Sequence, residues 1–474
     1  MPIVIMKFGG SCLTDESAFK KILNITNIYK NVKKVFVASA FVGITDLLLK
    51  TAKLVEDDEL IDKNIALIEK KHIDIVEQIF PEESEQYIKA KDWIDEKLSE
   101  LEDIFADIKE FGLEPYYQDY VLSFGELLST YILNQFLLGN NLDSIFIPAT
   151  KLIITNDGFN NAYPLYNLTI SRIKRFLNPL LDNPKKSTII CIPGFMGRNK
   201  IGYITTLGRG GSDYTATILA RGLYEAGNDK NIKVILWKNV DGLLAINPKY
   251  LRHPSLIKNL DYDEAKHIAN FGAKILHPKC LEAIEIHKIP LEIRNFDKPL
   301  EEKFTEISSK SDKKQIKGIS AIELATIITI ISGSMVDVPG VLAKIFRVMS
   351  KNKISVSFVA QSSSEISTSF IIMEEESERA IDALKSSKFF SEFFNIIWEH
   401  VAVINITGLK ILETKTKADI FNALYKREVN VKAISQSLNE LNLSIVIDRE
   451  KLVDAINIIH DDLYEEFEGS NVPK

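Results

Sequence analysis

The amino-acid sequence predicts an α/β protein in which a largely parallel, helix-covered sheet is followed by two copies of a small βαββα unit. Short apolar runs alternate with helix-length stretches through the first half of the chain, which is the rhythm of a parallel sheet. After residue 317 the same order of strands and helices occurs twice. The composition, 46% hydrophobic and 26% charged, is typical of globular proteins and provides enough apolar residues for a core.

The strands expected in the first half are buried apolar runs, and the longer segments between them are helical. The expected strands are Val4–Phe8, Val35–Ala38, Ser144–Ile147, Ser187–Ile192 and Lys233–Trp237. The expected helices are Ala18–Tyr29, Leu127–Leu137 and Tyr214–Gly222. Charged sequence with a helical period between about 47 and 115 favours a helical subdomain of the same domain over a solvated coiled-coil arm.

A polar, lysine-rich stretch at 308–317 has the composition of a linker and ends a first domain, 1–307. The repeat predicts one small domain at 318–395 and another at 396–466, with the strand near 316–323 as an alternative partner of the second. Val356–Ser362 in the first copy parallels Val431–Ser437 in the second. A solenoid needs three or more repeats, so we expect paired sensor modules.

Charge and cysteine usage exclude several classes of protein. A net charge of −7 argues against a nucleic-acid surface, and no apolar run has the length needed to cross a bilayer. The N-terminus reads as a strand without a targeting segment. Cys12, Cys191 and Cys280 offer neither metal-ligand spacing nor a disulfide framework. We therefore expect a cytoplasmic protein with no metal site of its own, no nucleic-acid partner and no membrane partner.

A glycine pair follows the first expected strand, in the sequence Lys7-Phe8-Gly9-Gly10-Ser11. Paired glycines let a ligand approach the backbone and leave amide groups free for anionic oxygens. A lysine at the strand end can neutralise charge on a phosphoryl group. By itself this motif fits a phosphate site and a plain tight turn equally well.

The most informative motif is Gly208-Arg209-Gly210-Gly211-Ser212-Asp213, which opens an expected helix. The glycines supply a turn rich in backbone donors, and the planar fork of Arg209 matches a carboxylate. Asp213 by itself is more often a favourable acid at a helix start. An arginine among glycines at the same turn points to a binding site.

Three further segments place polar groups near strand ends or helix starts. Glu126 is expected just before a helix, where it suits an ammonium group or simply the helix start. Ser39 and Thr45 follow the second expected strand, where parallel sheets bind ligands. Lys274 is a second candidate for a phosphate, whereas His277, before a proline, is more typical of a structural role. The sequence has no GxxxxGK[ST] loop, no protein-kinase HRD and DFG set and no GxSxG elbow.

Taken together and in this order, these segments resemble the aspartate kinase family. The repeat resembles the two ACT domains of that family, so the resemblance covers nearly the whole chain. It implies a three-layer αβα amino-acid kinase domain with a mainly parallel sheet, followed by two βαββαβ ferredoxin-like ACT domains. It also implies MgATP-dependent phosphorylation of the L-aspartate β-carboxylate, with Mg²⁺ held mainly by the nucleotide phosphates.

The resemblance assigns roles to individual residues. Catalysis falls to Lys7 and to Asp213, which orients it. The expected aspartate-binding residues are Ser39, Thr45, Glu126, Arg209 and Ser212. The expected ATP-binding residues are Lys7, Gly9, Gly10, Ser11, Lys238, Asn239, Leu244, Lys249 and Lys274. The expected effector-binding residues of the first ACT domain are Ser334, Met335, Asp337, Gly340, Val341, Leu342, Gln361, Ser362 and Ser363.

One segment departs from the family pattern. Family members usually carry Trp-Thr-Asp-Val-x-Gly-Val-Tyr-Thr-x-Asp-Pro-Arg for adenine and ribose, whereas this chain has an altered version at 237–249 with lysine at 238 and 249. This departure motivates an alternative, an amino-acid sensor with the same fold that has lost nucleotide binding. The family further implies threonine or lysine as effector and a homodimer or homotetramer formed through the ACT domains. No GxGxxG unit follows the repeat, so we expect the kinase without a homoserine dehydrogenase.

Overall fold

The computed structural model describes residues 1–182, 188–227, 231–270, 275–310, 316–332, 339–436 and 440–463. The chain forms two compact units. The first comprises Met1–Leu243, Lys258–Tyr262 and Ile275–Ser311, and the second comprises Leu244–Ile257, Asp263–Lys274 and Asp312–Lys474.

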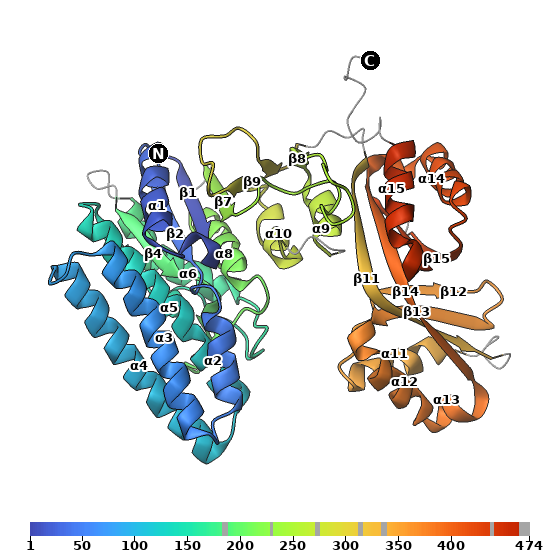
Figure 1. Ribbon diagram of the computed structural model, residues 1–474, viewed down its shortest axis with the longest axis horizontal. Helices are drawn as coiled ribbons and strands as arrows, with labels where there is room; N and C mark the ends of the chain where they lie inside the picture. The colour runs from blue at the N-terminus through green and yellow to red at the C-terminus, as the bar shows by residue number, and fades with distance from the viewer. Residues whose placement is uncertain are drawn as a thin grey trace. The chain divides into compact units, whose positions relative to one another are not determined.

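The first unit is built on an eight-stranded sheet in the order β3-β4-β2-β1-β7-β9-β10-β8 (Figure 1). Every neighbouring pair is parallel except β9 and β10. The strands are β1 (Ile3–Phe8), β2 (Lys33–Ala38), β3 (Ser144–Phe146), β4 (Ile189–Pro193), β7 (Ile232–Lys238), β8 (Asn259–Leu260), β9 (Leu291–Asn295) and β10 (Thr305–Ile307). The expectation of a mainly parallel sheet is confirmed.

Helices cover both faces of this sheet, which gives the three-layer arrangement. Met6 and Phe8 of β1 point into a core shared with α1 and α5, whereas the alternate residue Lys7 points toward α8 on the other face. α6 and α10 pack against α8 on that face. The helices are α1 (Glu16–Ile28), α6 (Tyr166–Phe176), α7 (Asn178–Leu181), α8 (Gly211–Glu225) and α10 (Pro278–Glu285). A further helix, α9 (Tyr262–Asn270), belongs to the second unit from Asp263 onward.

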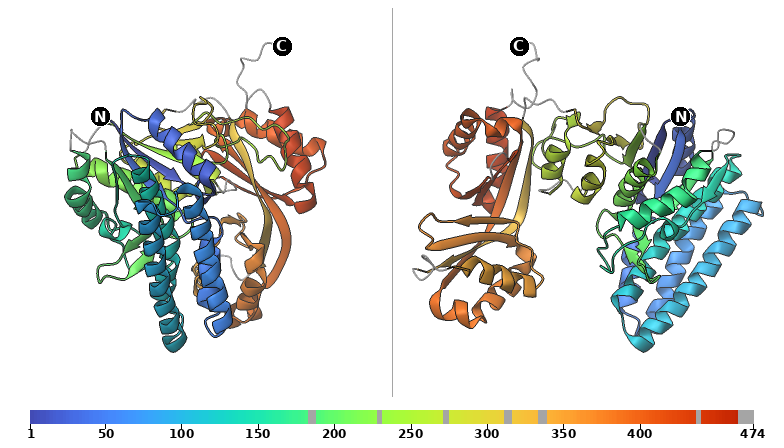
Figure 2. Two further views of the ribbon diagram at one scale, coloured as in Figure 1. Left: turned by 60° about the vertical axis from the view of Figure 1, so that its left-hand side comes forward. Right: turned by 180° about the vertical axis from the view of Figure 1, so that it is seen from behind.

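Four further helices form the helical part of the first unit, and α3, α4 and α5 lie side by side (Figure 2). They are α2 (Ile44–Lys53), α3 (Asp58–Ile79), α4 (Glu85–Phe111) and α5 (Pro115–Gly139). The side chains of Asp57 and Ser84 accept hydrogen bonds from the backbone at the starts of α3 and α4. Pro115 begins α5, as its fixed φ favours at a first helical position.

The helix α5 begins well before the helix expected at Leu127. Glu126 is therefore a mid-helix residue and not a first-turn acid. The later helix start expected from the sequence is explained by Gly125, because glycine lowers helix propensity and suggests a break. Its place is explained by packing: a Cβ at Gly125 would lie 2.7 Å from Cβ of Ala40. α5 is also the one described helix that is long and apolar enough to span a membrane. Of its most apolar stretch of 18 residues, 83% is buried inside the protein.

The second unit contains a six-stranded antiparallel sheet in the order β12-β13-β11-β14-β16-β15. The strands are β11 (Ile316–Ile331), β12 (Phe358–Gln361), β13 (Ser367–Met373), β14 (Asn395–Gly408), β15 (Val431–Ser435) and β16 (Asn442–Asp448). The helices are α11 (Val341–Lys351), α12 (Ser377–Lys385), α13 (Lys388–Phe393), α14 (Thr414–Lys426) and α15 (Leu452–Asp462).

The two ACT-like repeats share the two long central strands. The first half of β11, from Ile316 to Ile322, pairs with the end of β14, which in turn pairs with β16 of the second repeat. The second half of β11, from Ala325 to Ile331, pairs with β13 of the first repeat and with the beginning of β14. A register shift between Ile322 and Ala325 separates the halves. The repeats thus form one continuous sheet and not two separate ones.

Candidate active site

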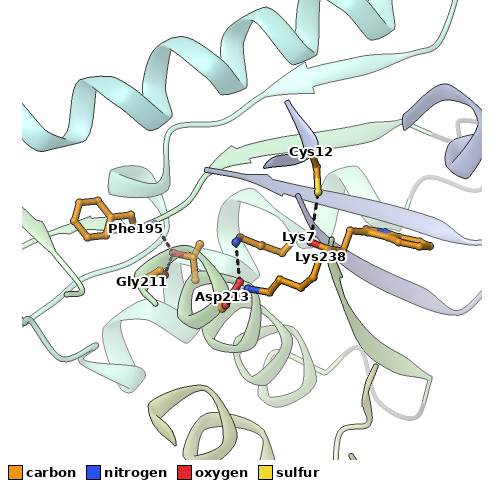
Figure 3. Close-up of polar contacts among 8 residues, drawn as sticks. Lys7, Cys12, Phe195, Gly211, Asp213 and Lys238 are labelled. Carbon is orange, nitrogen blue, oxygen red and sulfur yellow. Dashed lines mark hydrogen bonds and ion pairs between the residues drawn. The ribbon is translucent and has the colours of Figure 1, made fainter. Parts of the chain in front are cut away.

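Two lysines and one aspartate meet at the carboxyl ends of the central strands β1 and β7 (Figure 3). Lys7 lies opposite Leu236 in the register of these parallel strands, so Lys238, two residues further along β7, points to the same face of the sheet. Asp213 reaches this face from the first turn of α8. Its Oδ1 lies 2.8 Å from Nζ of Lys7, and its Oδ2 accepts a 2.7 Å hydrogen bond from Nζ of Lys238.

This charge cluster is largely shielded from water, with side chains 8% (Lys7), 6% (Asp213) and 19% (Lys238) exposed. Burial alone would raise the pKa of Asp213, but the two ammonium groups hold that pKa below its usual value. Burial lowers the pKa of Lys7, whereas the pull of Asp213 outweighs burial at Lys238 and raises its pKa. Two cations share one carboxylate, so the cluster carries an excess positive charge that suits an incoming anion.

The glycine pair after β1 lies directly beside the cluster. A Cβ on Gly9 would lie 3.5 Å from Nζ of Lys7, and a Cβ on Gly10 would come within 2.7 Å of the Ala40 carbonyl oxygen. Any side chain at Gly10 would therefore collide with the loop after β2. Ser11 is exposed at this turn, whereas Cys12 is buried, donates to the Trp237 carbonyl oxygen at 3.5 Å, and has a pKa raised by burial. Cys12 is therefore a packing residue.

The turn before α8 depends on glycine geometry. Gly210 has φ +71°, and a Cβ there would lie 2.8 Å from Cβ of His277. Gly208 has φ +78° and similarly faces Asn161. Arg209, held between these two glycines, has an exposed side chain for which no ion pair with another described residue is found. The turn thus presents a guanidinium group to solvent beside the charge cluster.

Glu126 of α5 contributes a buried carboxyl group near Lys7. The Ala40 backbone, the Lys7 ammonium group and the Ser212 side chain each act to lower the pKa of this group. Burial raises the pKa of Glu126 to about 8 despite these contacts. Its Oε2 is buried, and no described residue donates a hydrogen bond to it. An unpartnered carboxylate oxygen at this position fits a cationic donor from a ligand.

Ser39 lies in the loop between β2 and α2, Thr45 lies in the first turn of α2, and both are half-buried. The carbonyl oxygen of Ser39 accepts a 2.8 Å hydrogen bond from Oγ of Ser129 on α5, which ties this loop to the helix that carries Glu126. Thr45 is the second residue of α2, after Gly43 with φ +82°. Ser212 is buried, and a Cβ on Gly194 would lie 2.6 Å from its Cβ.

The structure shows two positioning residues that the motifs did not reveal. Asp119 of α5 is fully buried and accepts hydrogen bonds from the backbone N–H of Thr206 and Asn160 and from the Thr206 hydroxyl. Lys279 is buried and donates to Oδ1 of Asn161, the residue that faces Gly208 in the turn before α8. An acid within the apolar sequence of α5 was the only available signal for Asp119. His277 has the expected structural role, because its Nδ1 accepts from the Lys279 backbone at the start of α10.

The structure brings none of the other expected ATP-binding residues Asn239, Leu244 and Lys249 into the ion pairs of the cluster. Asn239 is exposed directly after Lys238. Leu244 and Lys249 belong to the second unit, where Lys249 forms an ion pair of 2.5 Å with Glu323. Lys274 lies outside the described residues. Among the residues the structure describes, no group of three or more His, Cys, Asp or Glu could hold a metal ion.

The expected effector residues are only partly described. Ser334, Met335 and Asp337 lie outside the described residues. In the second unit, Gly340 directly precedes α11 and has φ +88°. Val341 is buried, and Leu342 packs against the hydrophobic core of the first repeat. Of the remaining three residues, Gln361 ends β12, and Ser362 and Ser363 lie in the turn between β12 and β13.

In that turn, Oγ of Ser362 is occupied, since it accepts a 3.1 Å hydrogen bond from the Ser367 backbone, whereas Gln361 and Ser363 are exposed.

Comparisons with known proteins match both units. The model of the amino acid kinase family matches residues 2–295, and that of the ACT domain matches 328–387 and 411–463. The chain is 26% identical over 469 residues to the lysine-sensitive aspartokinase 3 of Escherichia coli, covering 98% of this chain and 99% of that protein. It is 28% identical over 478 residues to the bifunctional aspartokinase/homoserine dehydrogenase of Buchnera aphidicola subsp. Acyrthosiphon pisum, with 97% of this chain but 56% of that protein covered.

The fold agrees with the same group of proteins. The crystal structure of E. coli aspartokinase III in complex with aspartate and ADP matches with a TM-score of 0.81 and 25% identity, covering 98% of this chain and all of that one. The expected order of a kinase domain followed by ACT domains is confirmed. The chain therefore belongs to the amino acid kinase family, with the arrangement of kinase and ACT domains found in aspartokinases.

Proposed function

We propose that this protein is an aspartate kinase, which transfers the γ-phosphoryl group of MgATP to the β-carboxylate of L-aspartate and forms 4-phospho-L-aspartate. The observation that carries the proposal is the buried Oε2 of Glu126, unpartnered among the described residues, beside the positively charged Lys7, Asp213 and Lys238 cluster. An ammonium site next to an anion site fits an amino acid that accepts a phosphoryl group.

In this proposal aspartate is held by the two charged groups on its Cα. Glu126 binds the ammonium group, and the exposed fork of Arg209 binds the α-carboxylate. Ser39, Thr45 and Ser212 complete the pocket with hydroxyl groups. The β-carboxylate is ionised at neutral pH, so it needs no general base to become a nucleophile. Catalysis then depends on alignment and on charge neutralisation.

The phosphate chain of ATP is assigned to the turn Gly9–Ser11 and to Lys7, which neutralises charge on the phosphoryl group in transfer. Asp213 fixes the position of the Lys7 ammonium group. Mg²⁺ would be held by the phosphates of the nucleotide, because both oxygens of Asp213 already contact lysines. Asn239, Leu244, Lys249 and Lys274 remain candidates for further nucleotide contacts.

The ACT repeats suggest feedback regulation by an amino acid. Gly340–Leu342 and Gln361–Ser363 are the described parts of the proposed effector site. We propose lysine or threonine as the effector, a homodimer or homotetramer formed through the ACT domains, and a cytoplasmic location. The similarity to a lysine-sensitive aspartokinase supports lysine as the first compound to test. The expected product places the enzyme at the start of lysine, threonine and methionine synthesis.

ADP release by the purified chain with MgATP, measured with and without L-aspartate, tests this function. We expect turnover that requires aspartate and that lysine or threonine suppresses. ATP hydrolysis that is indifferent to aspartate would contradict the proposal. Binding of an amino acid without turnover or nucleotide binding would favour the amino-acid sensor instead.

A further inference from the structure

Lys238 lies at a position where the aspartate kinase pattern places a contact to adenine or ribose, yet its ammonium group points to Asp213 beside Lys7. Nζ of Lys238 lies 2.7 Å from Oδ2 of Asp213, the carboxylate that also contacts Nζ of Lys7. The two lysine nitrogens therefore lie on either side of a single carboxylate group, and each contacts one of its oxygens (Figure 3). Whatever phosphate Lys7 contacts lies within reach of Lys238.

The balance of charge at the cluster indicates a missing anion. One buried carboxylate faces two ammonium groups, and an uncompensated buried charge is costly. Glu126 also faces Lys7, but burial raises its pKa to about 8, so this acid is mostly protonated at pH 7 before a ligand binds. His277, directly before α10, also lies near Asp213, and its pKa is lowered by burial, so it adds no charge at neutral pH. The cluster thus has room for the negative charge of a phosphate group.

The two lysines differ in how freely they can move. The Lys7 side chain is 8% exposed and begins inside a fully buried strand, whereas the Lys238 side chain is 19% exposed and lies at the last residue of its strand. A long, flexible lysine stem at a strand end can change partner at low cost. If Lys238 moves away, Asp213 keeps its contact with Lys7, so no buried charge is left without a partner.

We propose that Lys238 is a second phosphate-binding cation, which Asp213 holds ready and which contacts the terminal phosphates of the bound nucleotide. This inference rests on the proposed kinase function and adds a specificity-determining residue to it. It predicts that Lys238 distinguishes nucleotides by the length of their phosphate chain and not by their base or ribose.

The test compares binding of ADP and AMP, by isothermal titration in the presence of Mg²⁺, to the wild-type chain and to Lys238→Met. Loss of a charge-assisted contact to a phosphate is expected to weaken ADP binding by about 10- to 100-fold. AMP binding should change less than about threefold, because AMP lacks the terminal phosphates. The variant Lys238→Gln keeps a hydrogen-bond donor for Asp213 but lacks the positive charge, and its ADP binding should be weakened as in Lys238→Met. An equal loss in both variants would assign the effect to the missing charge and not to a folding defect.

A matched control lies on the same strand. Lys233 of β7 forms an ion pair of 2.7 Å with Glu292, and Glu292 also contacts Arg294, so Lys233→Met likewise removes one of two cations from a carboxylate. ADP binding to Lys233→Met should equal that of the wild-type chain.

Two results would overturn the inference while leaving the proposed function intact: unchanged ADP binding in both Lys238 variants, or an equal loss of ADP and AMP binding. Absence of all nucleotide binding to the wild-type chain would overturn both the inference and the proposed function.

Discussion

Asp119 of α5 accepts two hydrogen bonds from Thr206 at the end of β6 (Ile204–Thr206), one of 2.8 Å from the backbone N–H and one of 2.6 Å from the hydroxyl. The same carboxylate accepts from the Asn160 backbone. These contacts join the helix that carries Glu126 to the strand that leads into the Gly208–Asp213 turn. Asp119 thus links the proposed ammonium site to the proposed carboxylate site, although it lies outside both.

Replacing Asp119 should therefore affect both stability and substrate binding. Asp119→Ala leaves buried donors at Thr206 and Asn160 without their acceptor, and we expect a loss of about 2–4 kcal/mol in the free energy of unfolding. Urea denaturation measures that loss, and the KM for aspartate should rise in the folded fraction. Asp103→Ala, at an exposed site on α4, is the control and should change neither quantity. A normal stability for Asp119→Ala would contradict the positioning role.

The raised pKa of Glu126 predicts that aspartate binds more tightly as the pH rises. With a pKa of about 8 the free enzyme holds this proton at pH 7, but a bound ammonium group favours the ionised carboxylate. Binding must therefore release a proton, and the Kd for aspartate should fall by up to about tenfold per pH unit between pH 6.5 and 8. Calorimetry in buffers of different ionisation enthalpy measures the released proton.

The control for this prediction is Glu126→Gln, which has no titrating group at this position. It should bind aspartate weakly and without the pH dependence. A pH dependence that persists in Glu126→Gln would assign the proton to another residue.

Arg209 should determine the affinity for aspartate more than the turnover rate. Its guanidinium is exposed and unpaired among the described residues, so its removal costs the folded protein little. Arg209→Ala should raise the KM for aspartate by about 10- to 100-fold through loss of a charge-assisted, two-point contact. Arg209→Lys should recover only part of this loss, since an ammonium group cannot form the planar fork. An unchanged KM in Arg209→Ala would show that the α-carboxylate binds elsewhere.

Gly210 should tolerate no side chain, for two separate reasons. Its φ of +71° disfavours L-residues, and an added Cβ would lie 2.8 Å from Cβ of His277. Gly227 has φ +97° but open space around its Cβ position, so Gly227→Ala measures the backbone strain alone. Gly210→Ala should lower the Tm more than Gly227→Ala and should also weaken aspartate binding. Equal effects of the two substitutions would show that the contact with His277 relaxes easily.

The sequence predicted the parallel sheet and the strand-end residues because periodicity and glycine motifs are local signals. Lys7 and Asp213 stand in such motifs, but their catalytic roles were expected only from the resemblance to the aspartate kinase family; their ion pair follows from the adjacency of β1 and α8. The length of α5 was missed because Gly125 suggested a break, and only its contact with Ala40 explains the glycine. The partner of Lys238 could not be predicted, because it depends on the register between β1 and β7.

The strand near 316–323 was expected as an alternative partner of the second repeat, but its continuation into the first repeat was beyond local reasoning. The repeat pattern predicted the order of strands and helices within each copy. It did not predict that one sixteen-residue strand, Ile316–Ile331, serves both copies, because that pairing joins residues far apart in the sequence.

The most direct test of the central claim is to trap the product with hydroxylamine, which converts an acyl phosphate into a hydroxamate. The wild-type chain with MgATP and L-aspartate should form aspartyl hydroxamate in proportion to the ADP released. Lys7→Met should lose most of this activity but remain folded, because Asp213 keeps its contact with Lys238. ADP release without hydroxamate, or equal hydroxamate formation by a folded Lys7→Met, would contradict the account.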